Sequence, residues 1–330
     1  MKPMTKSKET FNVKNQDQPL LNWQSINWRK VNKTISDLRG RIYRASAKGD
    51  MKRVGNLQKL MLRSHANKLL AIRRVTQTNQ GKNTSGVDKI VVKTDKERGE
   101  LYKQLTNLQL GHPYPVKRVH IPKKTGKLRP LGIPAVVDRC KQAIVKSALE
   151  PYWEAKFEPT SYGFRPGRSA HDAIERIFRS TCKMGQREYI LEADIKGAFD
   201  NIDHSYILRT IGNFPGKQLI KQWLEAGYME GNRMHPTETG CPQGGIISPL
   251  LCNIALHGMA KLLGIQYDDK GQVPHKSPYN LIFYADDFVV LARSKEECEQ
   301  AKHLIKTWLS ERGFRTFRGK NPHQTYYQGI

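Results

Sequence analysis

The sequence predicts a mixed α/β (α+β) fold that combines helices with hairpin-joined strands. Its 330 residues, of which 38% are hydrophobic, are enough to bury cores in two or three subdomains. Between residues 280 and 291, two apolar runs rich in aromatic and β-branched residues surround the acidic pair Asp286 and Asp287. Such runs are typical of two strands joined by a tight turn. Residues 26–76 instead repeat apolar positions every three or four residues, which is typical of amphipathic helices.

The charge distribution indicates a polyanionic partner. The formal net charge is +26, and residues 1–130 hold 30 Lys and Arg against 8 Asp and Glu, while residues 131–330 hold 26 against 22. An excess so concentrated in one part of the chain favours nucleic acid over a solvated basic surface or an anionic membrane. No apolar run approaches the roughly 20 residues of a membrane span, so we expect no membrane insertion.

Cysteine usage and the N-terminal residues together predict a cytoplasmic protein. The cysteines are odd in number, widely spaced and without a Cys-x-x-Cys pair, so they do not have the spacing of a zinc site. Residues 1–22 are polar and lack the apolar segment of a signal peptide, and we expect them to form a flexible tail. We therefore expect reduced thiols at Cys140, Cys182, Cys241, Cys252 and Cys298.

The basic residues of the N-terminal region lie between the apolar positions of two predicted helices, which are separated at Gly49 and Asp50. Such a pattern is often no more than a solvated charged face. Here almost no acidic residues balance the bases, which favours a surface that neutralises phosphates and releases their counterions. The candidate RNA-binding residues are Arg41, Arg44, Arg63, Arg73 and Arg74.

A basic hairpin is predicted between residues 116 and 134. Residues 116–122 alternate as a strand, residues 123–127 form a turn rich in lysine, and residues 128–134 form a returning strand interrupted by proline. A loop of this kind can close over a triphosphate, with Lys as a point charge and Arg as a fork. Basic hairpin tips are also common on protein surfaces, so this pattern alone is weak.

Further helices are predicted from periodicity and capping signals. Ser169 with Asp172, and Ser294 with Glu297, match capping boxes, while Ser248 followed by proline is typical of a helix start. The predicted helices span residues 95–110, 138–153, 170–181, 203–211, 217–229, 248–263 and 295–312.

Asp194 is a second acidic site inside an apolar strand, predicted to end near Ile195 before a turn at Gly197. An unpaired carboxylate is costly there, so either backbone donors or a lysine satisfy it, or it joins Asp286 and Asp287 around a metal. A glycine-rich turn at residues 239–247 allows close approach of a ligand to backbone, although it could equally serve packing. Three carboxylates, two Mg²⁺ ions and a triphosphate would make a two-metal phosphoryl-transfer site.

Several motifs in order resemble group II intron-encoded reverse transcriptase/maturases. Phe283 to Asp287 (FYADD) is similar to the catalytic box of reverse transcriptases. The other motifs are Ser161 to Arg168 (SYGFRPGR), Glu192 to His204 (EADIKGAFDNIDH) and Pro242 to Leu251 (PQGGIISPLL). The resemblance runs from about Trp23 to Gly313. Departures at Lys89, Cys241 and Phe283 are peripheral.

The resemblance implies a role for individual residues. Asp194, Asp286 and Asp287 would bind two Mg²⁺ ions, with the Ile195 carbonyl as a further ligand. Phe199 would be the steric gate that excludes a ribose 2′-hydroxyl, and Gln243 would pack near the incoming nucleotide. Lys123 and Arg129 would hold its triphosphate. On their own, Phe199 would suggest a core aromatic and Gln243 a turn residue.

The resemblance also implies a right-hand polymerase with fingers, a palm with an antiparallel sheet, and a basic helical N-terminal extension. The expected divisions are a tail at 1–22, the extension at 23–85, mainly fingers at 86–185, the palm at 186–313, and residues 314–330 unlike the family. A thumb is expected to be absent.

The implied function is that of an RNA-directed DNA polymerase that acts in group II intron mobility and assists splicing. Its partners would be template RNA, the intron RNA, a DNA primer or target, and deoxynucleoside triphosphates. Two alternatives stay open: a catalytically inactive RNA-binding maturase remnant, and a reverse transcriptase recruited to a CRISPR or phage-defence system. The sequence leaves the oligomeric state open.

Overall fold

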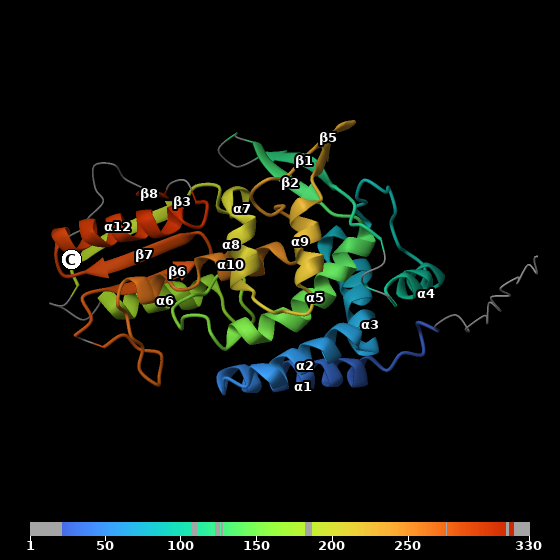
Figure 1. Cartoon of the computed structure of the whole chain (residues 1–330), viewed down its shortest axis with the longest axis horizontal. Coiled ribbons are helices and arrows are strands. Elements are labelled where there is room, and N and C mark those ends of the chain that lie inside the picture. Colours follow the sequence, from blue (N-terminus) through green and yellow to red (C-terminus); the bar gives the residue numbers. More distant parts are fainter. Residues whose placement is uncertain are drawn as a thin grey trace, which may run out of the picture.

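The computed structural model describes residues 22–106, 108, 111–122, 126, 128–181, 187–274, 276–314 and 317–319. It opens with helices α1 (Trp28–Ala47), α2 (Met51–Arg63) and α3 (His65–Arg73), which pack on one another and on the long helix α5 (Val136–Glu154). Figure 1 shows α1 and α2 side by side along one edge of the molecule. The predicted tail at 1–22 lies almost wholly outside the described residues.

The N-terminal helices break at one predicted place and at one place that was not predicted. α1 ends at Ala47, Gly49 then turns the chain with a φ of +71°, and Asp50 caps α2. The second break is at Ser64, which adopts extended backbone and accepts a hydrogen bond from the Asn67 N–H. Periodicity alone misses this break because apolar residues continue on both sides of it. A short π-helix (Arg74–Thr78) and a short 3₁₀-helix (Gln80–Asn83) follow, before α4 (Asp95–Gln104).

The predicted basic hairpin is confirmed, and it belongs to a larger sheet. Strands β1 (Val116–Pro122) and β2 (Leu128–Ile133) pair antiparallel. The sheet continues with β4 (Tyr228–Glu230), parallel to β1, and β5 (Arg233–His235), in the order β2-β1-β4-β5. The prediction of a helix over 217–229 is therefore wrong at its end: α9 (Lys217–Glu225) stops before Gly227, whose φ is +72°.

A second sheet, antiparallel throughout, carries the acidic residues. Its order is β6-β7-β3-β8, from β6 (Asn280–Tyr284), β7 (Asp287–Ala292), β3 (Tyr189–Ile195) and β8 (Phe317–Gly319). Helix α12 (Lys295–Ser310) packs on β3 and β7, and α6 (Ala170–Thr181) packs on β6. Figure 1 shows this sheet and its helices at one end of the molecule, with α7 and α8 between it and the β1–β2 hairpin.

Short helices join the two sheets. The helices α7 (Ala198–Asn201) and α8 (His204–Thr210) follow β3 in the chain. The helices α10 (Ser248–Leu256) and α11 (Met259–Leu262) lie between β5 and β6. The helix predicted over 248–263 is thus two helices, because Gly258 with a φ of +102° interrupts it. Ser248 does not cap α10 as predicted, since its hydroxyl donates to the Pro242 carbonyl instead.

No helix among the described residues is long and apolar enough to cross a membrane.

One contact between loop and sheet gives a stability prediction. A Cβ added to Gly163 would lie 2.3 Å from the Ala285 nitrogen at the β6–β7 turn. Gly163→Ala should therefore destabilise the protein by about 1–3 kcal/mol through overpacking. The matched control is Gly55→Ala within α2, where nothing lies within 4 Å, and which should stabilise by about 0.5–1 kcal/mol. Urea unfolding of both variants checks this, and equal effects of the two substitutions would contradict it.

Candidate active site

The β6–β7 turn consists of Ala285 and Asp286. Ala285 has a φ of +59°, which is unusual for a residue with a side chain. Asp287 is the first residue of β7 and lies opposite Tyr284. The expectation that both aspartates occupy the tip is therefore corrected: Asp286 lies in the turn and Asp287 in the strand.

The strand register brings the third acidic residue to the same place. Asp194 lies directly opposite Asp287 across the antiparallel β3–β7 pair, so the two side chains leave the same face of the sheet. One step along, the Ile195 N–H donates to the Asp286 carbonyl at 3.0 Å. Asp194 and the adjacent pair Asp286 and Asp287, which are distant in sequence, are thus held together where β3 pairs with β7.

The pKa of Asp286 is raised above its ordinary value, in part because the three carboxylates lie close together. Burial is the largest cause and raises this pKa, and the like charges of Asp194 and Asp287 raise it further, while a backbone hydrogen bond and the charge of Arg129 lower it. Oxygen donors of this kind suit Mg²⁺, and a cation would relieve the repulsion. Within the described parts of the chain, no three His, Cys, Asp or Glu side chains are already arranged as a set of metal ligands.

The predicted nucleotide-binding residues come together in part. Arg129, on β2, donates from Nε to Gln243 Oε1 at 2.7 Å. The Gln243 amide in turn donates from Nε2 to both carboxylate oxygens of Asp200, at 3.2 Å each. Lys123 lies outside the described residues. Asp200 was given no role by the sequence, although it directly follows Phe199.

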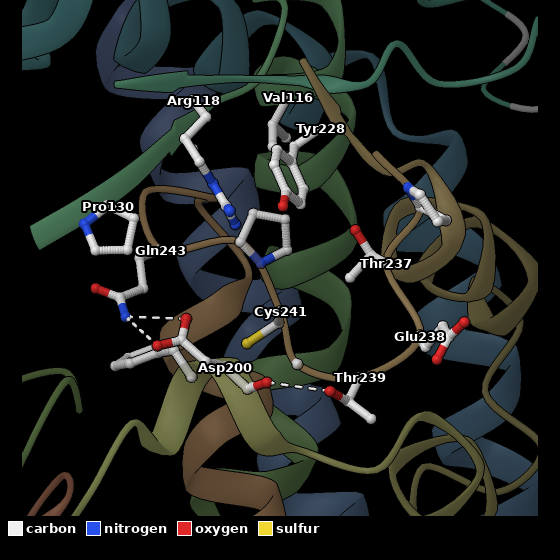
Figure 2. Close-up of a pocket in the computed structure, with 15 residues that line it drawn as sticks. Val116, Arg118, Pro130, Asp200, Tyr228, Thr237, Glu238, Thr239, Cys241 and Gln243 are labelled. Atoms are coloured by element: carbon white, nitrogen blue, oxygen red, sulfur yellow. Dashed lines mark hydrogen bonds between the residues drawn. The ribbon is translucent and has the colours of Figure 1, made fainter. Parts of the chain in front are cut away.

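Phe199 lies at the start of α7, and 7% of its surface is exposed. Its ring meets that of Phe164 edge-on, with the centroids 6.0 Å apart. Phe199 also lines a cavity of about 480 Å³ between the β1–β2 hairpin, β4 and the glycine turn. Figure 2 shows Gln243 and Asp200 facing each other at one side of this cavity. The three carboxylates are not among its lining residues.

The glycine turn is fixed against α7 by its backbone. The Gly240 and Cys241 N–H groups donate to the carbonyls of Ile202 and Phe199, at 2.8 and 2.7 Å. A Cβ on Gly240 would lie 2.6 Å from the Asp200 carbonyl, so only glycine fits. The turn also meets β2, where the Gly132 N–H donates to the Gln243 carbonyl at 2.6 Å. This turn therefore joins the element that follows β3 to the basic hairpin.

Not every basic residue of the N-terminal helices is available to a ligand. Arg39 pairs with Glu150 at 2.6 Å, and the buried Lys68 donates to the Thr106 carbonyl. Arg73 stacks over the Trp28 ring at 4.4 Å. Fewer basic side chains of these helices are available to a ligand than the sequence suggested. Some of them form ion pairs or hydrogen bonds with acids and carbonyls of other elements. The candidate residues that are exposed are Arg41, Arg44, Arg63 and Arg74.

Comparison with known proteins agrees with this arrangement. The family described as "Reverse transcriptase (RNA-dependent DNA polymerase)" matches residues 121–322. The chain belongs to this family. The "N-terminal domain of reverse transcriptase" matches residues 23–105, the region of the helices α1 to α4. The expected mixed fold, with its helical N-terminal region and antiparallel sheet, is confirmed.

Individual relatives include intron-encoded proteins. Group II intron-encoded protein LtrA of Lactococcus lactis subsp. cremoris is 33% identical over 294 residues, which cover 70% of this chain and 48% of LtrA. Protein YkfC of Escherichia coli (strain K12) is 37% identical over 204 residues, 59% of this chain and 54% of YkfC. Maturase-like protein 1 of Euglena gracilis is 30% identical, with coverages of 72% and 52%. The chain spans about half the length of these relatives.

The raised pKa of Asp286 predicts that its charge lowers stability at neutral pH. Asp286→Asn should unfold at a higher temperature than wild type at pH 7. The difference should shrink as the pH falls through the raised pKa, because wild-type Asp286 then takes up its proton. Asp203→Asn is the control of opposite sign, since the Ser205 hydroxyl and Tyr206 N–H lower the pKa of Asp203. Thermal unfolding between pH 4 and pH 7 measures both, and a less stable Asp286→Asn at pH 7 would refute the electrostatic description.

Proposed function

We propose that this chain catalyses RNA-templated DNA synthesis in group II intron mobility, and that it assists splicing by binding the intron RNA. The observation that carries the proposal is the register that sets Asp194 opposite Asp287 with Asp286 beside them. Family membership supports the reaction class, and the similarity to LtrA supports the intron context.

Two Mg²⁺ ions would be held by Asp194, Asp286, Asp287 and the Ile195 carbonyl. When bound, they lower the pKa of the primer 3′-hydroxyl and neutralise charge on the leaving pyrophosphate. The chain's own residues supply the rest. The carboxylates would fix where the 3′-oxygen meets the α-phosphorus, and Arg129, whose charge acts on Asp286, would bind the phosphates. Lys123 would assist in binding the triphosphate.

The nucleotide's sugar would rest against Phe199. Phe164 packs on its ring, so the ring has little room to turn away from a ribose 2′-hydroxyl. Gln243 would contact the same nucleotide from the glycine turn. We further propose the divisions expected from the sequence, with the extension at 23–85, fingers mainly at 86–185 and the palm at 186–313.

Template and intron RNA would lie across the N-terminal helices, with a DNA primer or target entering the active site. The exposed arginines Arg41, Arg44, Arg63 and Arg74 support this surface, while Arg73 would act through its stacking on Trp28.

Primer extension tests the function directly. Wild type should extend a DNA primer on an RNA template with Mg²⁺ and deoxynucleotides, and Asp286→Asn should show only background synthesis while remaining folded. The same conservative change at Asp203, which caps α8, should keep synthesis. Equal extension by wild type and Asp286→Asn would refute the site.

Substitution of Phe199 tests sugar selection. Phe199→Val removes the ring that blocks a 2′-hydroxyl, so the preference for deoxynucleotides over ribonucleotides should fall by roughly 10–100-fold. Competing single-nucleotide incorporation of dGTP and GTP provides the ratio. Phe157→Val, in a stack with Trp153, serves as a core control and should leave the ratio unchanged. An unchanged ratio in Phe199→Val would exclude the gate.

Salt dependence tests the RNA surface. A variant with alanine at Arg41, Arg44 and Arg63 should bind intron RNA more weakly. The slope of log affinity against log salt should decrease in magnitude by about 2, as expected for three lost phosphate contacts on single-stranded RNA. Alanines at Lys261, Lys302 and Lys306, on α11 and α12, form the matched control. An equal change of slope in both variants would mean that only net charge matters.

A further inference from the structure

The Gln243 amide lies between a guanidinium and a carboxylate, and this fixes its orientation. Arg129 Nε can only donate, and the Asp200 carboxylate can only accept. The single arrangement that satisfies both places Oε1 toward Arg129 and Nε2 toward Asp200, with contacts of 2.7 Å and twice 3.2 Å. Figure 2 shows the two bonds from Gln243 to Asp200 at the cavity wall.

The backbone of Asp200 makes the contacts that hold this residue in place. Its carboxylate is therefore available to bind the Gln243 amide. Its N–H donates to the Gly197 carbonyl at 2.9 Å, and its carbonyl accepts from the Thr239 hydroxyl at 3.2 Å. The close approach of Gly240 is also to the Asp200 backbone. The contacts that hold α7 to the glycine turn would therefore survive removal of the carboxylate.

The chain of contacts ends at the Arg129 guanidinium, whose charge acts on the candidate catalytic residue Asp286. The Arg129 guanidinium uses Nε for Gln243, and its charge lowers the pKa of Asp286 against the stronger effects that raise it. Fixing Nε restricts rotation of the guanidinium plane, so both Nη groups of this exposed side chain are held in one orientation for binding phosphate oxygens.

We propose that Asp200 is a positioning residue for the incoming nucleotide, which acts by fixing the Gln243 amide and through it the Arg129 guanidinium. This rests on the proposed polymerase function and extends it, since it assigns control of triphosphate binding to an acidic residue that touches neither metal ligand nor substrate. Asp200 follows the proposed sugar gate Phe199 directly, so one turn of α7 contributes to binding both the sugar and the phosphates.

Loss of the carboxylate should weaken nucleotide binding more than chemistry. Asp200→Ala should raise the KM for dNTP about tenfold, the size expected for one lost hydrogen bond to a charged group, and change kcat by less than about threefold. Asp200→Asn keeps one acceptor for Nε2 and should restore most of the affinity. Glu238→Ala is the matched control, because Glu238 lines the same cavity and carries the same charge but has no contact with Gln243.

A double-mutant cycle separates positioning from a general structural role. In an Arg129→Ala background, Asp200→Ala should add little, because its effect passes through Arg129. Additive losses in the double variant, or an unchanged KM in Asp200→Ala, would overturn the proposal, as would an equal effect of Glu238→Ala.

Nucleotide binding measured without synthesis keeps the two proposals apart. Isothermal titration of dGTP in the presence of Ca²⁺, with the RNA–DNA hybrid bound, reports affinity whether or not the chain extends a primer. Weaker binding by Asp200→Ala together with an inactive wild type would reject the proposed synthesis and keep the role of Asp200. Equal binding by both, with an active wild type, would reject the role of Asp200 alone.

Discussion

The antiparallel pairing of β3 with β7 is the constraint on which the rest of the site depends. It sets Asp194 against Asp287 and ties Ile195 to Asp286, so three like charges share one corner of a partly buried sheet. Unrelieved, this costs stability. The fold accepts that cost because neighbouring elements hold the turn: Gly163 packs directly on Ala285, and the Ser161–Phe283 bridge extends the same contact. A slip of one residue would turn Asp194 to the other face.

The second organising element is the glycine turn, which joins the acidic sheet to the basic hairpin. Its backbone forms hydrogen bonds with Phe199, Ile202 and Gly132. These bonds place Gln243 between the guanidinium of Arg129 and the carboxylate of Asp200. The glycine turn thus connects Arg129 of β2, through Gln243, to Asp200, which lies six residues after Asp194. The two partners of Gln243 come from other elements, Arg129 from β2 and Asp200 from α7. The hydrogen bonds of Gln243 therefore form only when these elements are correctly placed relative to each other.

Much of the fold could be predicted from local sequence patterns. The features that could not be predicted depend on contacts between residues that are far apart in the sequence. The hairpin at 116–134, the strand bearing Asp194 and the capping of α12 at Ser294 depend on neighbouring residues, and all three are present. The strands β4 and β5 were missed because they are three residues each and gain their stability from pairing with β1. Asp200 was missed for a similar reason: its partner Gln243 lies 43 positions away, and no local pattern marks such a contact.

We propose that divalent cations bind where β3 pairs with β7. Replacing Mg²⁺ by Fe²⁺ with ascorbate and peroxide produces hydroxyl radicals at the bound ion, and these cut the backbone nearby. We expect cleavage next to Ile195 and next to Asp286, suppressed together by excess Mg²⁺ and lost together in Asp286→Asn. Cleavage confined to other parts of the chain, or cuts at both positions that persist in Asp286→Asn, would contradict it.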